Sequence, residues 1–188
     1  MSLNKEQQLR LLDLAKSSIQ HGLQTGRPLK INLTDFPAEL TERRATFVTL
    51  HKHHQLRGCI GMLEAVRPLV EDIAENAFLA AFRDPRFPPL AADEFGELDI
   101  HLSILTPAEP VSFTSEQDLI TQLQPGIDGL ILEEGRRRGT FLPSVWEQLP
   151  EPQQFLRHLK QKAGLSPDYW SENIRISRYR TEMIYLVS

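Results

Sequence analysis

The sequence contains only one cysteine, Cys59, and it lacks any long apolar run. A single cysteine cannot form an internal disulfide or a cysteine-rich zinc site, so a reducing cytoplasm is the simplest compartment. No segment approaches the ~20 apolar residues that a membrane span needs. The first residues, MSLNKEQQLRLL, hold no apolar stretch typical of a secretory signal. We therefore expect no association with a membrane.

An excess of positive charge is also missing. The 188 residues include 21 Lys and Arg against 25 Asp and Glu, which gives a formal net charge of −4. Proteins that bind nucleic acid usually carry a basic excess, because contacts to phosphate dominate their affinity. We therefore expect no nucleic-acid partner. With 40% hydrophobic and 24% charged residues, the composition is that of a globular chain, which is long enough for one well-buried core or for a main core with a smaller lobe.

Hydrophobic periodicity predicts interspersed helices and strands. Helices are expected over 4–22, 67–83, 116–123 and 152–164, and strands over 45–51, 56–62, 98–106, within 128–146 and within 173–188. Asn4 is the predicted cap of the first helix and Gly22 its predicted end. The Gly- and Pro-containing segment 25–40 is predicted to be a linker. Because the strands come in hairpin-like pairs, we expect a single α+β domain, a mainly antiparallel sheet flanked by helices.

The stretch LRGCIG, residues 56–61, holds the cysteine. Side chains alternate along a strand, so Leu56 and Ile60 are predicted to face the core, and Arg57 and Cys59 the opposite side. On that side Arg57 and Cys59 would stand ~6–7 Å apart along the strand. A nearby guanidinium favours the thiolate and lowers the pKa of a cysteine.

Two glycines, Gly58 and Gly61, flank the cysteine. Glycine within a strand usually marks a bulge, or a place where another backbone or a ligand comes close. Free cysteine is also among the most buried residue types, where it acts as a small hydrophobe. Three interpretations of Cys59 stay open: a nucleophile, part of a binding-site wall, or a small core residue.

His101 is the second candidate for chemistry. The stretch LDIHLSILT alternates cleanly and places His101 on its polar face, beside Ser103. If this strand and LRGCIG share a sheet and their polar faces coincide, His101 can approach Cys59 as a base. The alternative is a half-exposed or hydrogen-bonded side chain without a catalytic role.

Charged clusters complete the candidates. The stretch FRDPRFPPL places Arg83, Asp84 and Arg86 around a proline-stiffened turn, which suits either an anion-binding rim or simple charge pairing near a helix end. The stretch HKHH, residues 51–54, is a weak metal signal and is interpreted as a solvated hairpin turn. The arginine run 136–138 is interpreted as another solvated hairpin tip. We expect neither a metal nor a cofactor.

The stretches ATFVTL, LRGCIG, NAFLAAFRDPRFPPL, LDIHLSILT and GTFLPSVW together resemble the AMMECR domain family. LRGCIG corresponds to the signature hexapeptide of that family, and the resemblance covers about residues 9–186. It implies a larger lobe built on an antiparallel sheet, a smaller lobe, and a cleft near the signature. The residues carried over are Leu56, Arg57, Gly58, Cys59, Ile60 and Gly61 from the signature, and Asp84, Pro85, Arg86 and Phe87 from the second motif.

The resemblance implies no single biochemical activity. Bacterial and archaeal members include a protein of the AmmeMemoRadiSam system, beside a Memo-like and a radical-SAM protein. Our leading hypothesis is a cytoplasmic protein that binds a small molecule or a peptide end, with Cys59 and His101 as catalytic residues. Its binding residues would be Arg57, Gly58, Gly61, Asp84 and Arg86. The alternative is a non-catalytic accessory module that binds a Memo-like or radical-SAM partner.

Overall fold

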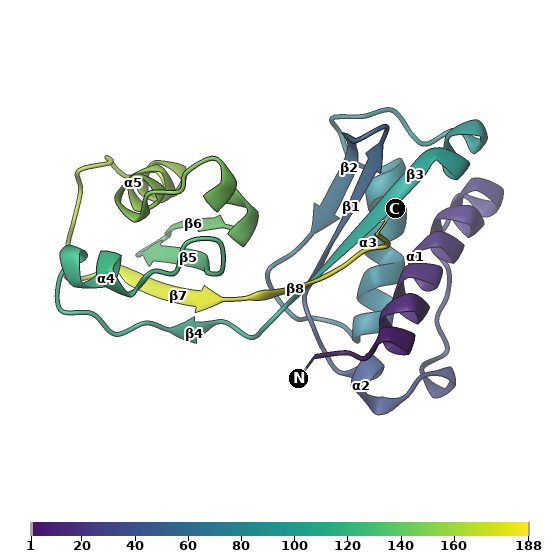
Figure 1. The fold of residues 1–188 in the computed structure, drawn as a ribbon, viewed down its shortest axis with the longest axis horizontal. Coiled ribbons are helices and arrows are strands. Elements are labelled where there is room, and N and C mark those ends of the chain that lie inside the picture. The colour runs from purple at the N-terminus through teal and green to yellow at the C-terminus, as the bar shows by residue number, and fades with distance from the viewer. Residues whose placement is uncertain (1, 188) are drawn as a thin grey trace. The chain divides into compact units, whose positions relative to one another are not determined.

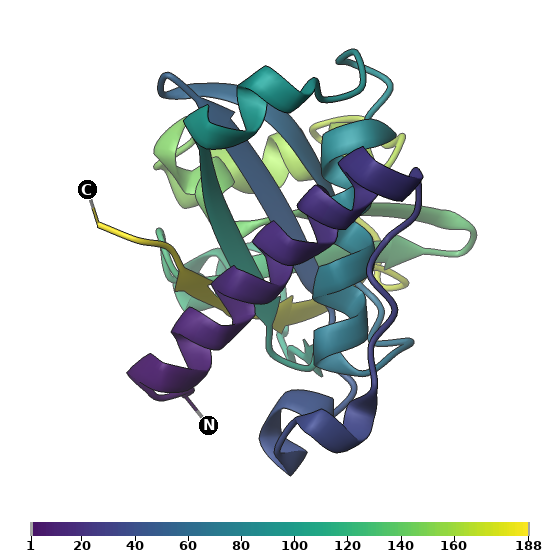
Figure 2. The ribbon, with the colours of Figure 1, turned by 90° about the vertical axis from the view of Figure 1, so that its right-hand side faces the viewer.

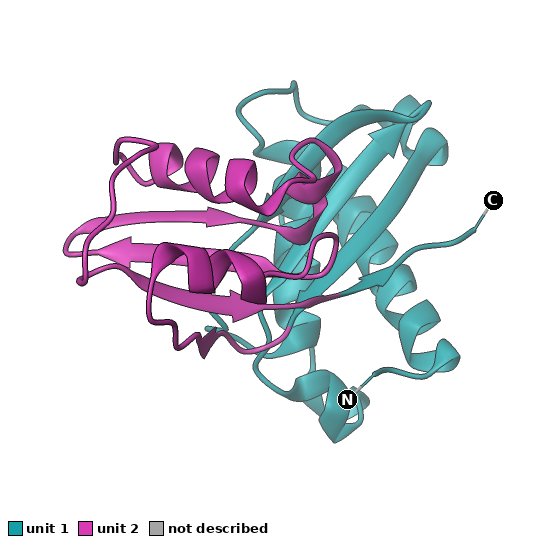
Figure 3. Ribbon diagram, turned by 60° about the vertical axis from the view of Figure 1, so that its left-hand side comes forward, with its two compact units in different colours: residues 1–105, 182–188 teal, residues 106–181 magenta. Residues whose placement is uncertain are grey.

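The computed structural model describes residues 2–187, which form two compact units (Figure 3). Unit 1 comprises residues 1–105 and 182–188, and unit 2 comprises residues 106–181. Unit 2 is therefore inserted in the sequence of unit 1, and each unit has a hydrophobic core of its own. Within residues 2–187, no helix combines the length and apolarity that a bilayer crossing requires.

Unit 1 consists of a four-stranded sheet and helices. Its elements are α1 (Lys5–Thr25), the 3-10 helix η1 (Leu33–Asp35), α2 (Ala38–Thr41), β1 (Thr46–Lys52), β2 (Gln55–Gly61), α3 (Leu69–Phe82), the 3-10 helix η2 (Ala92–Glu97), β3 (Leu98–Leu105) and β8 (Thr181–Ile184). The strand order is β2-β1-β3-β8, so β2 and β8 form the edges. Helices α1 and α3 lie side by side across one face of this sheet (Figures 1 and 2).

The core of unit 1 lies between that sheet face and the two helices. Alternate residues of the central strands supply the sheet side of the core: Val48, Leu50, Ile100, Leu102 and Ile104. The helices contribute Leu11, Ala15, Ile19, Ile73, Ala77 and Ala80. The intervening residues Thr49, His101 and Ser103 are only half-buried, so the alternation predicted for residues 98–104 is confirmed. The face away from the helices is therefore polar.

Helix α1 begins as predicted but ends later. Asn4 Oδ1 accepts a hydrogen bond from the N–H of Gln7, and the Asn4 N–H donates one to Gln7 Oε1, which completes a capping box. The prediction that Gly22 ends the helix is wrong, because α1 continues to a left-handed cap at Gly26, where φ is 73°. Gly22 instead permits close packing of the helices, since a Cβ there would lie 2.5 Å from a ring carbon of Phe82.

Unit 2 is a second antiparallel sheet with its own helices. Its elements are β4 (Glu109–Pro110), α4 (Glu116–Gln122), β5 (Gly129–Glu134), β6 (Arg137–Phe141), the 3-10 helix η3 (Pro143–Glu147), α5 (Pro152–Lys162) and β7 (Arg175–Tyr179). The strand order is β4-β7-β5-β6. Trp146 and Phe155 stack at the centre of its core, with ring centroids 3.7 Å apart. The α+β class and the antiparallel pairing are thus as predicted.

The hairpin of β1 and β2 forms as predicted, but alternation in β2 fails at one position. Leu50 pairs with Gly58, whereas its neighbour His51 pairs with Leu56, so Arg57 is an extra residue in a β-bulge. The bulge puts Leu56 on the face of His51, and Leu56 is 41% exposed. The prediction that Leu56 faces the core is therefore wrong.

Gly58 lies where the backbone of α3 reaches the sheet. A Cβ at this position would stand 2.1 Å from the carbonyl oxygen of Ala80. This distance is too short for any residue other than glycine. The close approach inferred from the strand glycine is therefore real, and its partner is a helix backbone. The glycine lets α3 pack directly onto β2.

This contact generates the first prediction. We expect Gly58→Ala to lower the free energy of unfolding by about 1–3 kcal/mol or more, because the helix must move away from the strand. Denaturant unfolding followed by circular dichroism measures the change. The matched control is Gly96→Ala in η2, where an added Cβ would meet no described atom within 4 Å. Equal stability of the Gly58→Ala and wild-type proteins would contradict the contact.

Candidate functional site

Cys59, Thr49 and His101 form a row across the polar face of the unit 1 sheet. Thr49 in β1 pairs with Cys59 on one side and with His101 on the other. Because adjacent strands are ~4.8 Å apart, the backbones of Cys59 and His101 are separated by about 10 Å. The Cys59 Sγ lies 3.2 Å from the Thr49 Oγ1. The cysteine and histidine thus share a sheet face, and Thr49 stands between them.

The imidazole of His101 is held by three neighbours. Its Nε2 lies 3.1 Å from Asp99 Oδ2, and its ring stacks on Tyr185 with centroids 5.0 Å apart. The ring of His51 meets it edge-on at 4.9 Å. Partial burial lowers the pKa of His51, and the neighbouring His101 lowers it further. A neutral His51 therefore packs against a positioned His101.

The main chain of Cys59 is clamped from outside the sheet. An edge strand normally leaves outward N–H and C=O groups unpaired. Here the Cys59 N–H donates to Asp84 Oδ2 at 3.0 Å, and Nη2 of Arg86 donates to the Cys59 carbonyl at 3.4 Å. Two hydrogen bonds, of 3.0 and 2.8 Å, also join the Arg86 guanidinium to the Asp84 carboxylate. Asp84 and Arg86 of the stretch DPRF, residues 84–87, therefore supply to Cys59 the two backbone hydrogen bonds that a further strand would make.

Asp84 is the buried member of this clamp. Its side chain is only 2% exposed, whereas that of Arg86 is 55% exposed. The hydrogen bond from Arg86 holds the pKa of Asp84 well below its ordinary range, and the N–H of Cys59 adds to the effect. The carboxylate is therefore ionised throughout the physiological range.

Arg57 is turned by the bulge toward residues 88–94 rather than toward the thiol. Its Nε and Nη2 donate to the two carboxylate oxygens of Glu94 at 3.0 and 3.1 Å, and Nη2 also donates to the carbonyl of Pro88 at 2.8 Å. Arg57 is 7% exposed. The pairing with Arg57 lowers the pKa of Glu94 to about 2. Sequence reasoning placed Arg57 beside the thiol because a strict period of two ignores the bulge.

The remaining predicted residues have separate positions. Gly61 lies against β1, where an added Cβ would come 2.3 Å from the Thr46 carbonyl oxygen. Arg83 lies over the ring of Phe78, 5.8 Å from its centroid, at the end of α3. His53 and His54 form the hairpin turn with positive φ values of 51° and 63°.

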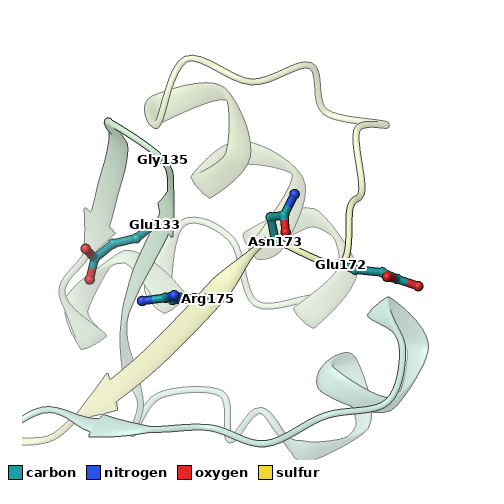
Figure 4. Close-up of a pocket in the computed structure, with 5 residues that line it drawn as sticks. All are labelled: Glu133, Gly135, Glu172, Asn173 and Arg175. Carbon is teal, nitrogen blue, oxygen red and sulfur yellow. The ribbon is translucent and has the colours of Figure 1, made fainter.

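No group of three His, Cys, Asp or Glu side chains within residues 2–187 is arranged to hold a metal ion. A polar pocket of about 420 Å³ in unit 2 is lined by Glu133, Gly135, Glu172, Asn173 and Arg175 (Figure 4). In that view the side chains of Glu133 and Glu172 extend in opposite directions, so their carboxylates do not converge.

Sequence reasoning missed Thr49 and Glu94. Alternation within residues 45–51 places Thr49 on the polar face, which was a usable signal. Glu94 is 37 residues from Arg57 and carries no local signal of the pairing. Its role follows only from the tertiary fold.

These features define an α+β protein whose polar sheet face carries a clamped cysteine. The AMMECR1 family model matches residues 12–184, and the chain belongs to this family. A protein from Methanothermobacter thermautotrophicus is 36% identical over 185 residues, covering 97% of this chain and 96% of its own length. A Methanocaldococcus jannaschii protein is 39% identical over 158 residues, which cover 82% of this chain and 79% of that protein. The crystal structure of an uncharacterized Pyrococcus horikoshii protein matches with a TM-score of 0.85 at 34% identity. The match covers 96% of this chain and 92% of that protein.

The ion pair of Arg57 and Glu94 generates the second prediction. The pKa of Glu94 falls from 4.5 to about 2 in the folded protein, so its stabilisation is fully present above pH 4.5 and is lost as the pH falls toward 2. We expect Glu94→Gln to destabilise the protein at neutral pH and to have a shrinking effect over this acid range.

Denaturant unfolding at a series of pH values measures both curves. Glu39→Gln, which removes an exposed carboxylate from α2, serves as the control for a general charge effect. Curves for Glu94→Gln and wild type that run parallel from neutral pH to pH 2 would show that the pair contributes nothing that depends on protonation.

Proposed function

We propose that this AMMECR1-family protein binds a small molecule or a peptide end on the sheet face that carries Cys59, with the thiol as nucleophile or covalent acceptor. The observation that carries the proposal is the clamp on the Cys59 main chain. Asp84 and Arg86 fix both outward backbone groups of one residue, and the half-buried thiol projects onto the polar face. Such fixation suits a side chain that must present a reactive atom in one orientation.

Arg86 is the anion-binding residue in this proposal. Its Nε and Nη2 are occupied by Asp84 and the Cys59 carbonyl, whereas Nη1 makes no hydrogen bond with any residue of the described range. A guanidinium that is anchored through one edge and exposed at the other suits a carboxylate or phosphate of a ligand. Arg57 is bound to Glu94 and takes no part in binding the anion. Its role in this proposal is to stabilise β2 at the bulge.

His101 acts on the far end of the ligand. About 10 Å separate its backbone from that of Cys59, so it does not deprotonate the thiol directly. A ligand that lies across Thr49 would contact the thiol at one end and the imidazole at the other. His101, held by Asp99 and Tyr185, would then exchange a proton with the bound molecule.

A second function is favoured by one observation. Large apolar side chains are exposed at the ends of the signature strand, namely Leu56, Met62 and Val66. Exposed apolar surface is a feature of protein interaction sites, and these three side chains would meet a partner that lies along the strand. They support a non-catalytic accessory module that binds a partner such as a Memo-like or radical-SAM protein. In this case Cys59 would have a structural role in β2 and no catalytic role.

The proposed function generates the third prediction. We expect Cys59 to react with alkylating reagents in the folded protein. The positive charge of Arg86 should raise the reaction rate of the anion iodoacetate more than that of the neutral reagent iodoacetamide. Arg86→Gln should lower the ratio of the iodoacetate rate to the iodoacetamide rate by roughly three- to tenfold, because local positive charge concentrates the anion. The ratio cancels any change in thiol exposure or ionisation. Since the chain has one cysteine, labelling reports this site alone.

Two controls accompany the measurement. Arg83→Gln removes a guanidinium that lies over Phe78 and should leave the ratio unchanged. Cys59→Ser gives the background of labelling. If Cys59 reacts only after denaturation, the covalent role fails and the accessory module becomes the leading function. An unchanged ratio in Arg86→Gln removes Arg86 from the proposed anion site.

A further inference from the structure

The segment predicted to be a linker forms one wall of a pocket in unit 1. The pocket has a volume of about 480 Å³ and is lined by Arg27, Pro28, Leu29, Lys30 and Ile31 on one side and by Arg67, Glu71 and Glu75 on the other. Figure 2 shows this part of the chain leaving the end of α1 and running beside α3. The volume lies within the range typical of small-molecule sites. The pocket shares no residue with the Cys59 site.

The pocket is anchored to both helices. The Leu29 N–H donates to Ser18 Oγ at 3.1 Å, and Ser18 Oγ donates to the Ala74 carbonyl at 2.6 Å. Ser18 in α1 is fully buried, so this bridge excludes water. Leu29 and Ile31 also pack against the hydrophobic core. The walls are therefore held in place before any ligand arrives, which reduces the ordering cost of binding.

The acidic wall carries two carboxylates without partners. Glu71 and Glu75 are four residues apart on α3, so they lie on the same helix face as neighbours. Neither carboxylate makes a hydrogen bond or ion pair with any residue between 2 and 187. Like charges at this spacing destabilise a helix. A ligand ammonium group between them would relieve the repulsion.

The opposite wall carries the matching cations. The side chains of Arg27 and Lys30 likewise make no hydrogen bond or ion pair with the described part of the chain. Arg67, the third cation, is already neutralised, because its Nε donates to Asp72 at 2.7 Å. Two free carboxylates thus face two free cations across apolar side chains. A ligand with one positive and one negative group would pair with both walls and leave the net charge of the pocket unchanged.

We propose that this pocket binds a zwitterion of amino-acid type, either a free amino acid or a short peptide, with an aliphatic side chain. The ammonium lies between Glu71 and Glu75, and the carboxylate is bound by Arg27 and Lys30. The aliphatic side chain packs on Leu29 and its apolar neighbours. The linker is therefore a recognition element.

Leucine and the dipeptide Leu-Leu are the probes, titrated to about 10 mM into isotope-labelled protein while amide shifts are followed by NMR. We expect saturable shifts at residues 27–31 and 67–75 for at least one probe. N-acetylleucine lacks the ammonium and leucinamide lacks the carboxylate, so each should bind about tenfold more weakly than leucine. Glycine, which lacks the aliphatic group, should also bind more weakly.

The double variant Glu71→Gln, Glu75→Gln should weaken leucine about tenfold without weakening N-acetylleucine, an anion that those carboxylates repel. Glu39→Gln is the matched control, and thermal unfolding of each variant verifies the fold. Cys59→Ser should bind leucine normally, which separates this proposal from the function at the cysteine. The absence of saturable shifts with both probes overturns the proposal, as does equal binding of leucine and N-acetylleucine.

Discussion

The contact between the Gly58 backbone and the carbonyl of Ala80 is the constraint on which the Cys59 site depends. Without a side chain at Gly58, the last turns of α3 lie directly on the edge strand β2. The chain leaves α3 at Phe82, so Asp84 arrives two residues later at the outward groups of Cys59. A bulkier residue at position 58 would move the helix and, with it, the carboxylate. A packing contact in the core thus sets the geometry of a polar clamp at the surface.

Two ion pairs, each with one buried member, extend this attachment along the same strand. Arg86 with Asp84 holds the Cys59 main chain, and Glu94 holds the guanidinium of Arg57 at the bulge. Burying charges costs free energy unless the partners and hydrogen bonds are nearly complete, as they are for both carboxylates. The pairs also cover the outward groups of an edge strand, which would otherwise invite pairing with another chain. The stretch LRGCIG therefore attaches residues 84–94 to the sheet as well as carrying the thiol.

The two candidate sites of unit 1 lie on opposite faces of its sheet. The polar face carries Cys59, Thr49 and His101, while the pocket between residues 27–31 and α3 lies on the helix side. Ser18 joins α1, α3 and the linker segment through two hydrogen bonds, which hold Leu29 against both helices. An irregular segment that is tied at a buried hydroxyl can hold charged side chains in a fixed arrangement.

The sequence by itself determined the elements whose signals are local. Alternation placed His101 on the polar face of β3, the Asn4 and Gln7 pair started α1, and the glycine in β2 indicated a close approach. Tertiary structure decided the bulge at Arg57, the continuation of α1 beyond Gly22, and the pairing of Arg57 with Glu94. Periodicity reports which side of an element is apolar, because that depends on neighbours within a turn or a strand. It carries no information about which distant residue meets a charge, because that partner is set only when helices and strands pack together.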